Sequence, residues 1–296
     1  MEQSSTAKRG LRTAAGDLKK ESKRPIVGDA GISLQLRTNL FLGTVEMGEK
    51  ILQCLVQAGD IFVPEVFDGG KQTGGRKVKF DSQDLSLPLK EWVDDPYSLG
   101  IIAERQGPVE STLHVSATSF VMFDHLGLSV DSRWFTIAEH VDRFVGLARD
   151  LCGIIRPNSG YVQNWRSERV LGEITDEYGN LVGYSAPKVK WALKGIFWGN
   201  FFGPEYVEMF GRKKMMTAPC YKIEELQDGG VLLLLSKSPL EASEPEYLAR
   251  KNELYAYLGQ DAFTGKLMPT FRTEGRKKRD ARPLVETGGI RDDVFS

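Results

Sequence analysis

Residues 191–236 read WALKGIFWGNFFGPEYVEMFGRKKMMTAPCYKIEELQDGGVLLLLS, and this stretch decides the fold. Gly203 interrupts an apolar run and Pro204 follows it; proline suits the first helical position because its φ is preset and its missing N–H would be unpaired there. Glu205 complements the positive end of the helix dipole, and Gly211 can take the conformation that ends a helix. The pattern predicts a short helix from Pro204 to Phe210.

A hairpin is expected directly after this helix. A second short helical piece, residues 212–218, ends at Pro219, and an apolar-polar strand then enters the turn 227–230, which holds Asp228, Gly229 and Gly230. The return strand, residues 231–235, is apolar on both faces. Because such a strand is normally covered on both sides, we expect it inside a sheet.

Bulky aromatic residues are concentrated in this stretch: Trp198, Phe201, Phe202, Tyr206 and Phe210. The simplest interpretation is that they form part of a hydrophobic core. The alternative is that they belong to an interaction surface.

Periodicity elsewhere predicts further strands and helices around this unit. Apolar stripes at helical spacing indicate helices over residues 44–58, 136–152 and 244–258, and strands are expected over 32–42, 101–104, 111–123 and 161–165. Residues 166–187 read as a polar loop that projects into solvent. The expected fold class is α+β, a mostly antiparallel sheet system with amphipathic helices packed on it, and two similar βα-type halves are one way to build it.

The charge of −1 conceals an acidic body between basic ends. Residues 29–265 carry 24 basic against 32 acidic residues, a balance of −8. We expect a disordered basic leader over 1–28, one α+β body over 29–265 with a possible sub-boundary near 155–190, and a disordered basic tail over 266–296. The acidic body argues against nucleic-acid binding by the folded part and is compatible with a basic protein partner.

No export signal or membrane-spanning run is apparent, and Cys54, Cys152 and Cys220 lie far apart in apolar settings. These features indicate a cytoplasmic protein with buried, reduced thiols. His114, His125 and His140 are assigned to a strand, a turn and a helix, without the spacing of metal ligands. We therefore expect no metal, no cofactor and no catalytic residues. A hydrolase that uses Cys220 or His140 remains the enzymatic alternative.

The order of elements and one motif resemble bacterial type VI secretion immunity proteins and related polymorphic-toxin immunity families. The matching residues of the motif are Trp198, Phe202, Gly203, Glu205, Val207, Gly211, Gly229 and Gly230, with Pro204 and Tyr206 inside it. The chain departs from the pattern in its basic ends, in the 166–187 loop and at residues 238–241. The resemblance implies a protein that neutralises a toxin by stoichiometric binding rather than by catalysis, and it leaves a homodimer open.

A partner surface is predicted where carboxylates lie beside a tyrosine in polar loops. One such place holds Asp94, Asp95 and Tyr97, and the other holds Asp176, Glu177 and Tyr178. Charge would steer a basic toxin into encounter and tyrosine would supply anchoring area. The alternative is that both are ordinary solvated loops. A regulatory module whose basic ends bind nucleic acid is the third possibility.

Overall fold

The structure is a computed structural model that describes residues 31–68, 77–92, 98–107, 109–118, 123–168, 173–175, 181–184, 193–264, 267 and 269. Its centre is a ten-stranded sheet with the order β11-β12-β10-β7-β1-β6-β5-β4-β2-β3. Every strand pair in it is antiparallel. The predicted α+β class and the antiparallel sheet are therefore confirmed.

The strands of the large sheet are β1 (Gly31–Thr38), β2 (Val66–Asp68), β3 (Lys77–Lys79), β4 (Ser98–Arg105), β5 (Ser111–Thr118), β6 (Asp124–Asp131), β7 (Ser159–Asn164), β10 (Gly199–Phe202), β11 (Lys222–Glu225) and β12 (Val231–Leu234). The strands β8 (Glu173–Thr175) and β9 (Leu181–Tyr184) form a separate pair.

The α-helices are α1 (Val45–Ala58), α2 (Ser86–Trp92), α3 (Ala138–Ile155), α4 (Pro204–Phe210), α5 (Arg212–Met216), α6 (Pro245–Leu258) and α7 (Asp261–Thr264). The described residues also include the short 3₁₀ helices η3 (Asp60–Phe62), η4 (Ser132–Thr136) and η5 (Pro239–Glu241).

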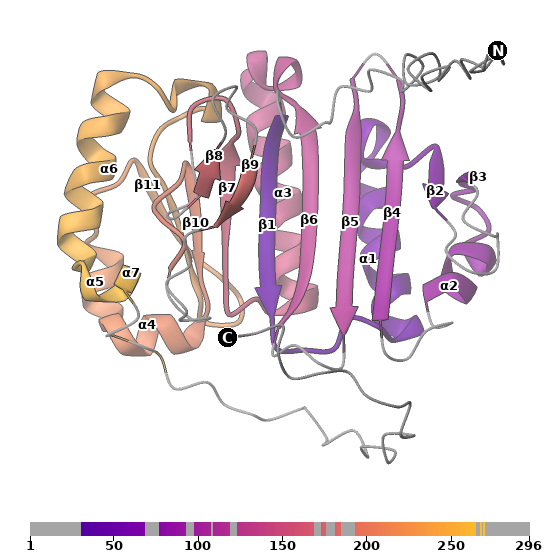
Figure 1. Ribbon diagram of the computed structural model, residues 1–296, viewed down its shortest axis with the longest axis horizontal. Coiled ribbons are helices and arrows are strands. Elements are labelled where there is room, and N and C mark those ends of the chain that lie inside the picture. The colour runs from indigo at the N-terminus through magenta and orange to yellow at the C-terminus, as the bar shows by residue number, and fades with distance from the viewer. Residues whose placement is uncertain are drawn as a thin grey trace, which may run out of the picture.

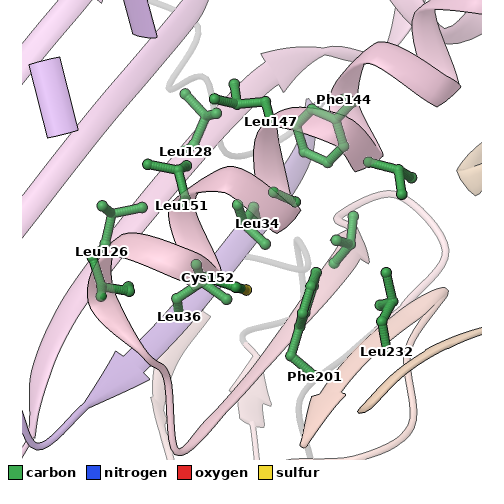
Figure 2. Packing of buried hydrophobic residues seen from close by; sticks show 14 of the residues in the cluster. Leu34, Leu36, Leu126, Leu128, Phe144, Leu147, Leu151, Cys152, Phe201 and Leu232 are labelled. Atoms are coloured by element: carbon green, nitrogen blue, oxygen red, sulfur yellow. The ribbon is translucent and has the colours of Figure 1, made fainter. Parts of the chain in front are cut away.

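Helices α1 and α3 lie side by side behind the middle of the sheet (Figure 1). Alternate residues of the strands, among them Leu34, Leu128 and Phe201, point toward α3 and meet its apolar stripe, which includes Phe144 and Leu151 (Figure 2). All five side chains are at most 1% exposed. The apolar stripe that repeats every 3.6 residues on the helix thus packs on the apolar face formed by every second residue of the strands, and together they make one core.

The hairpin predicted from residues 220–235 is present as β11 and β12. Leu226 N donates to Gly230 O at 2.8 Å across the turn, where Gly229 has a φ of 85°. Strand β12 pairs with β11 on one side and with β10 on the other, so it lies inside the sheet as predicted. The aromatic cluster around Trp198 is buried, which confirms the core interpretation.

Two expectations are wrong. His125 does not lie on a turn: it is part of β6, a full strand between β1 and β5. The segment after β7 is not wholly a solvent loop either, because Glu168 is 1% exposed and residues 173–175 and 181–184 pair as β8 and β9. Leu126, Leu128 and Val130 of β6 alternate with His125, Gly127 and Ser129, which is the pattern of a half-buried strand, and the turn interpretation overlooked it.

The large sheet is continuous across the possible sub-boundary near 155–190. Strand β7, which follows α3, pairs with β1 from Ile32↔Asn164 to Arg37↔Ser159. Its other edge pairs with β10. Strands from both parts of the sequence are therefore hydrogen-bonded within one sheet.

Candidate functional site

The six residues predicted to touch a partner lie outside the described residues. Asp94, Asp95 and Tyr97 belong to the stretch 93–97, and Asp176, Glu177 and Tyr178 belong to 176–180. The structure therefore gives no geometry for this surface, which stays a prediction from the sequence.

The motif residues, in contrast, are all described and lie at the junction of β10, α4 and the β11–β12 hairpin. Trp198, Phe202 and Tyr206 are buried there. The Phe202 ring packs edge-on against those of Tyr206 and Phe210, with ring centroids 6.2 and 6.0 Å apart. Gly211 ends α4 with a φ of 89°. The motif is thus first of all a packing unit.

Gly203 and Gly230 allow close approach of backbone in this unit. A Cβ at Gly203 would lie 2.4 Å from Pro157 O, and one at Gly230 would lie 2.7 Å from Phe202 O. Gly203 N also donates to Asn158 O at 2.8 Å. The missing side chain at Gly203 lets the start of α4 approach the segment that joins α3 to β7, and the missing side chain at Gly230 lets the hairpin turn approach the end of β10.

We expect Gly203→Ala to lower the free energy of unfolding by about 1–3 kcal/mol, the usual range for overpacking in a tight site. The cause is space rather than conformation, because Gly203 has a φ of −68°. Denaturant melts of both proteins measure the difference. The control is Gly146→Ala on α3, where the nearest atom to an added Cβ is the end of the Arg149 side chain at 3.9 Å. Equal stability of Gly203→Ala and the parent would contradict this account.

A groove runs beside this unit. One cavity of about 700 Å³ is lined by α1, the end of α3 and the hairpin turn, and includes Gln57, Asp150 and Asp228. A second, of about 420 Å³, is lined by Asp228 again together with Arg156 and Glu205. Because the two cavities share lining residues, we treat them as one feature and call it the hairpin groove.

Most cations around the hairpin groove are already paired. Lys50 Nζ lies 2.6 Å from Glu46 Oε1, Arg149 contacts Glu224 at 3.3 Å, and Arg212 pairs with Glu225. Three carboxylates that line the groove have no ion pair within the described part of the chain: Asp150, Glu205 and Asp228. Arg156 also lines the groove and has no ion pair to another described residue, so the two linings together hold four carboxylates (Asp150, Glu205, Glu225 and Asp228) against three cations (Lys50, Arg149 and Arg156), a small surplus of negative charge.

Two of these carboxylates have an oxygen that is buried and lacks a hydrogen-bond partner among the described residues. They are Oε2 of Glu205 and Oδ2 of Asp228. The other oxygen of Asp228, Oδ1, accepts from Gly230 N at 2.9 Å and thereby fixes the turn. Since leaving a buried acceptor unpaired is unfavourable, a donor supplied from outside would be stabilised at both positions.

The thiols offer little for nucleophilic chemistry. Burial raises the pKa of Cys54 and of Cys220 to about 11. Burial, and after it the nearby Asp228 carboxylate, also raises the pKa of Cys152 well above its ordinary value. A nucleophilic cysteine requires the opposite shift, toward the thiolate. The geometry therefore does not favour Cys220 as a nucleophile.

His140 is held by its neighbours in a structural arrangement. Its ring stacks on that of Trp134 with centroids 4.3 Å apart, and its Nδ1 donates to Trp134 O at 2.7 Å. The contacts of Cys220 are with the backbone of Ala218 and Lys222 instead. No described contact brings these two candidate residues together.

Within the ranges that the structure describes, no three His, Cys, Asp or Glu side chains gather as a metal site would require. None of the helices there has both the length and the apolar content needed to cross a bilayer.

Comparison with known proteins finds a protein of similar fold but no family to which the chain can be assigned. No protein-family model and no curated protein matches the sequence. A solved structure titled "Pseudomonas aeruginosa T6SS protein PA0821" is similar, with a TM-score of 0.53 and 15% identity over 82% of this chain and 76% of that one. At this identity the likeness concerns the arrangement of helices and strands.

Sequence reasoning named Glu205 and Asp228 only as parts of a helix start and a turn. Each does have that local role. Their meeting in one groove depends on β10 and β12 being neighbours in the sheet, a long-range pairing that no local pattern reveals. In the sequence, the two carboxylates are marked only by their position next to or near glycines that allow a tight backbone, Gly203 for Glu205 and Gly229 for Asp228.

Proposed function

We propose that this protein is an immunity protein of a type VI secretion or related toxin system, and that it neutralises a basic toxin by binding it stoichiometrically through the hairpin groove. The observation that carries the proposal is the pair of buried, unpartnered carboxylate oxygens of Glu205 and Asp228 in that groove. The similar fold of the Pseudomonas aeruginosa type VI secretion protein is compatible with this role.

A cationic side chain is the group that fits these oxygens best. Arginine and lysine donate only, and a hydrogen bond from a charged donor to a carboxylate is stronger than a neutral one. The acidic balance of residues 29–265 would also accelerate encounter with a basic protein. A groove that binds basic side chains of a toxin needs no catalytic residue of its own.

The binding test uses the product of the reading frame adjacent to that of this chain, purified together with the intact protein. We expect a 1:1 complex by calorimetry and loss of toxicity on co-expression. The double variant Glu205→Gln, Asp228→Asn should weaken binding by about 2 kcal/mol or more, since removing one member of a desolvated charge pair typically costs about 2–5 kcal/mol. The Asp228→Asn change retains a side-chain oxygen that can accept from Gly230 N, so the turn should persist.

The matched control is Glu208→Gln, which removes a carboxylate from the exposed side of the same helix, α4. It should bind like the parent. If the double variant binds as tightly as the control, the hairpin groove is not the interface. Charge reversal of Asp94 and Asp95, and of Asp176 and Glu177, then tests the loop surface predicted from the sequence.

The enzymatic alternative has its own test. Cys220→Ser and His140→Ala should leave protection against the toxin unchanged if the protein acts by binding. Loss of protection in a variant that remains folded would favour catalysis.

A further inference from the structure

The face of the sheet opposite α1 and α3 carries a row of polar residues that the proposed function does not use. Strand registers align His125 of β6 with Arg37 of β1, Arg37 with Ser159 of β7, and Ser159 with Phe202 of β10. Residues directly opposite one another in adjacent strands share a face. Arg37 is therefore at the centre of this row, flanked by a histidine and a serine.

The segment before β10 brings Lys194 to the same place. Asn200 holds this segment by two hydrogen bonds to the backbone of Phe197, from Phe197 N at 2.9 Å and to Phe197 O at 2.7 Å. The Phe197 ring also stacks on that of Tyr161, with centroids 4.2 Å apart. Arg37 and Lys194 then line a common cavity of about 20 Å³ over β7.

Among the residues that the structure describes, no carboxylate balances these two cations. The cavity lining contains no Asp or Glu, and neither Arg37 nor Lys194 forms an ion pair within the described part of the chain. Burial and then the Arg37 charge lower the pKa of Lys194 below its ordinary value. Like charges in a half-buried site repel each other, and charged side chains are seldom removed from water without a partner. Two such cations in one cavity are unexpected in a body, residues 29–265, that carries more acidic than basic residues.

We propose that Arg37 and Lys194 form a binding site for a single oxyanion group, such as a carboxylate or a phosphate, on the face of the sheet opposite α3. The guanidinium fork of Arg37 matches two oxygens of such a group, and Lys194 adds a point charge. The cavity of about 20 Å³ has room for little more than one water-sized atom. One oxygen of the anion would therefore enter it, and the rest of the ligand or partner side chain would extend outward.

Hydroxyl groups complete the site without adding negative charge. Ser159 lines the cavity, and its side chain is hydrogen-bonded to that of Tyr206 on α4. Burial raises the pKa of Tyr206 to about 12, so its hydroxyl stays protonated at neutral pH. Hydroxyl groups can donate to an anion, whereas a carboxylate at the same place would have repelled it.

The test titrates the intact, isotope-labelled protein with sodium acetate and, separately, with sodium phosphate, at ionic strength held constant with sodium chloride. NMR shifts of Arg37, Lys194 and His125 should saturate with at least one anion. Arg37→Gln and Lys194→Gln should each weaken that binding about ten-fold or more, the scale of one hydrogen bond to a charged group. Arg37→Lys, which keeps the charge and loses the fork, should bind more weakly than the parent and more tightly than Arg37→Gln.

His125 supplies an independent readout. Burial, the Arg37 charge and His114, in that order, lower its pKa to about 4. Removing the charge in Arg37→Gln should raise this pKa, and so should a bound anion in the parent. Lys213→Gln on α5, an exposed cation outside the cavity, is the control and should change neither the affinity nor the pKa.

A larger response to acetate identifies a carboxylate, on a free molecule or an acidic partner, and a larger response to phosphate identifies a phosphoryl group. Absence of saturation with both anions overturns the proposal. So does saturation that persists equally in Arg37→Gln, Lys194→Gln and the control. Neither outcome affects the toxin-binding proposal, because the hairpin groove and its variants share no residue with this cavity.

Discussion

Glu168→Ala should lower the free energy of unfolding by about 3–5 kcal/mol, the range for breaking a buried ion pair by removal of one member. The Glu168 side chain is fully buried, and its Oε1 is 3.3 Å from Lys251 Nζ and accepts from the hydroxyl of Tyr247. Its Oε2 accepts from Asn164 N at 2.9 Å and from Trp198 N at 3.4 Å. Alanine would leave four donors from three parts of the chain without their acceptor.

Chemical denaturation of the parent and of Glu168→Ala measures this difference. Glu168→Gln keeps one carbonyl oxygen for Tyr247 but would direct an amide at backbone donors, so we expect an intermediate loss. Glu253→Ala removes an exposed carboxylate from α6 and should change stability by at most about 0.5 kcal/mol. A loss in Glu168→Ala no larger than in Glu253→Ala would show that the network contributes nothing.

The pH dependence of the difference has a defined sign. Burial raises the pKa of Glu168 above 4.5, against the opposing effects of Lys251 and the hydrogen bonds. A carboxyl group whose pKa is higher in the folded state favours folding most below its unfolded pKa, and this contribution falls as pH rises through the folded pKa. The stability difference between parent and Glu168→Ala should therefore be largest near pH 4 and decrease toward neutral pH.

Local signals in the sequence were sufficient for most of the elements. Gly211 ends α4 with a positive φ, as predicted from the sequence, and the helix predicted over residues 44–58 is present as α1, capped by Thr44, which accepts from Met47 N, and ended by Gly59. Such features depend on residues within one helical turn. They were therefore readable without knowledge of the rest of the fold.

Features that depend on long-range pairing were not readable. Glu168 follows a polar stretch with no apolar period, and its burial depends on α6, some 80 residues later, closing over it with Tyr247 and Lys251. The juxtaposition of Arg37 with Lys194 likewise requires β1, β7 and β10 to be neighbours. Sequence patterns specify which face of a strand is apolar, whereas the order of strands decides which polar residues meet.

Trp198→Ala should lower the free energy of unfolding by about 3–5 kcal/mol, the range for deleting a buried aromatic side chain. Trp198 is fully buried, and its indole Nε1 donates to Ser236 O at 3.0 Å. Its backbone carbonyl accepts from Leu235 N at 2.9 Å, next to β12. Alanine would leave a cavity in the core beside Ser236 and an unpaired carbonyl at that residue.

Two variants separate the contributions at Trp198. Trp198→Phe keeps most of the ring volume and removes the donor, so it should cost less than Trp198→Ala. Tyr221→Ala removes an aromatic ring that is 47% exposed and serves as the control, with an expected change within about 0.5 kcal/mol. A full loss in Trp198→Phe would assign the effect to the hydrogen bond rather than to the volume.

The Glu168 and Trp198 sites should also be coupled, because Glu168 accepts from the backbone of Trp198. In a double-mutant cycle, Glu168→Ala with Trp198→Ala should destabilise by less than the sum of the single changes, with a difference of about 0.5–3 kcal/mol. The physical reason is that either change alone already loosens the segment that the other side chain holds. Strict additivity would mean that the carboxylate of Glu168 stabilises α6 and β7 independently of the Trp198 segment.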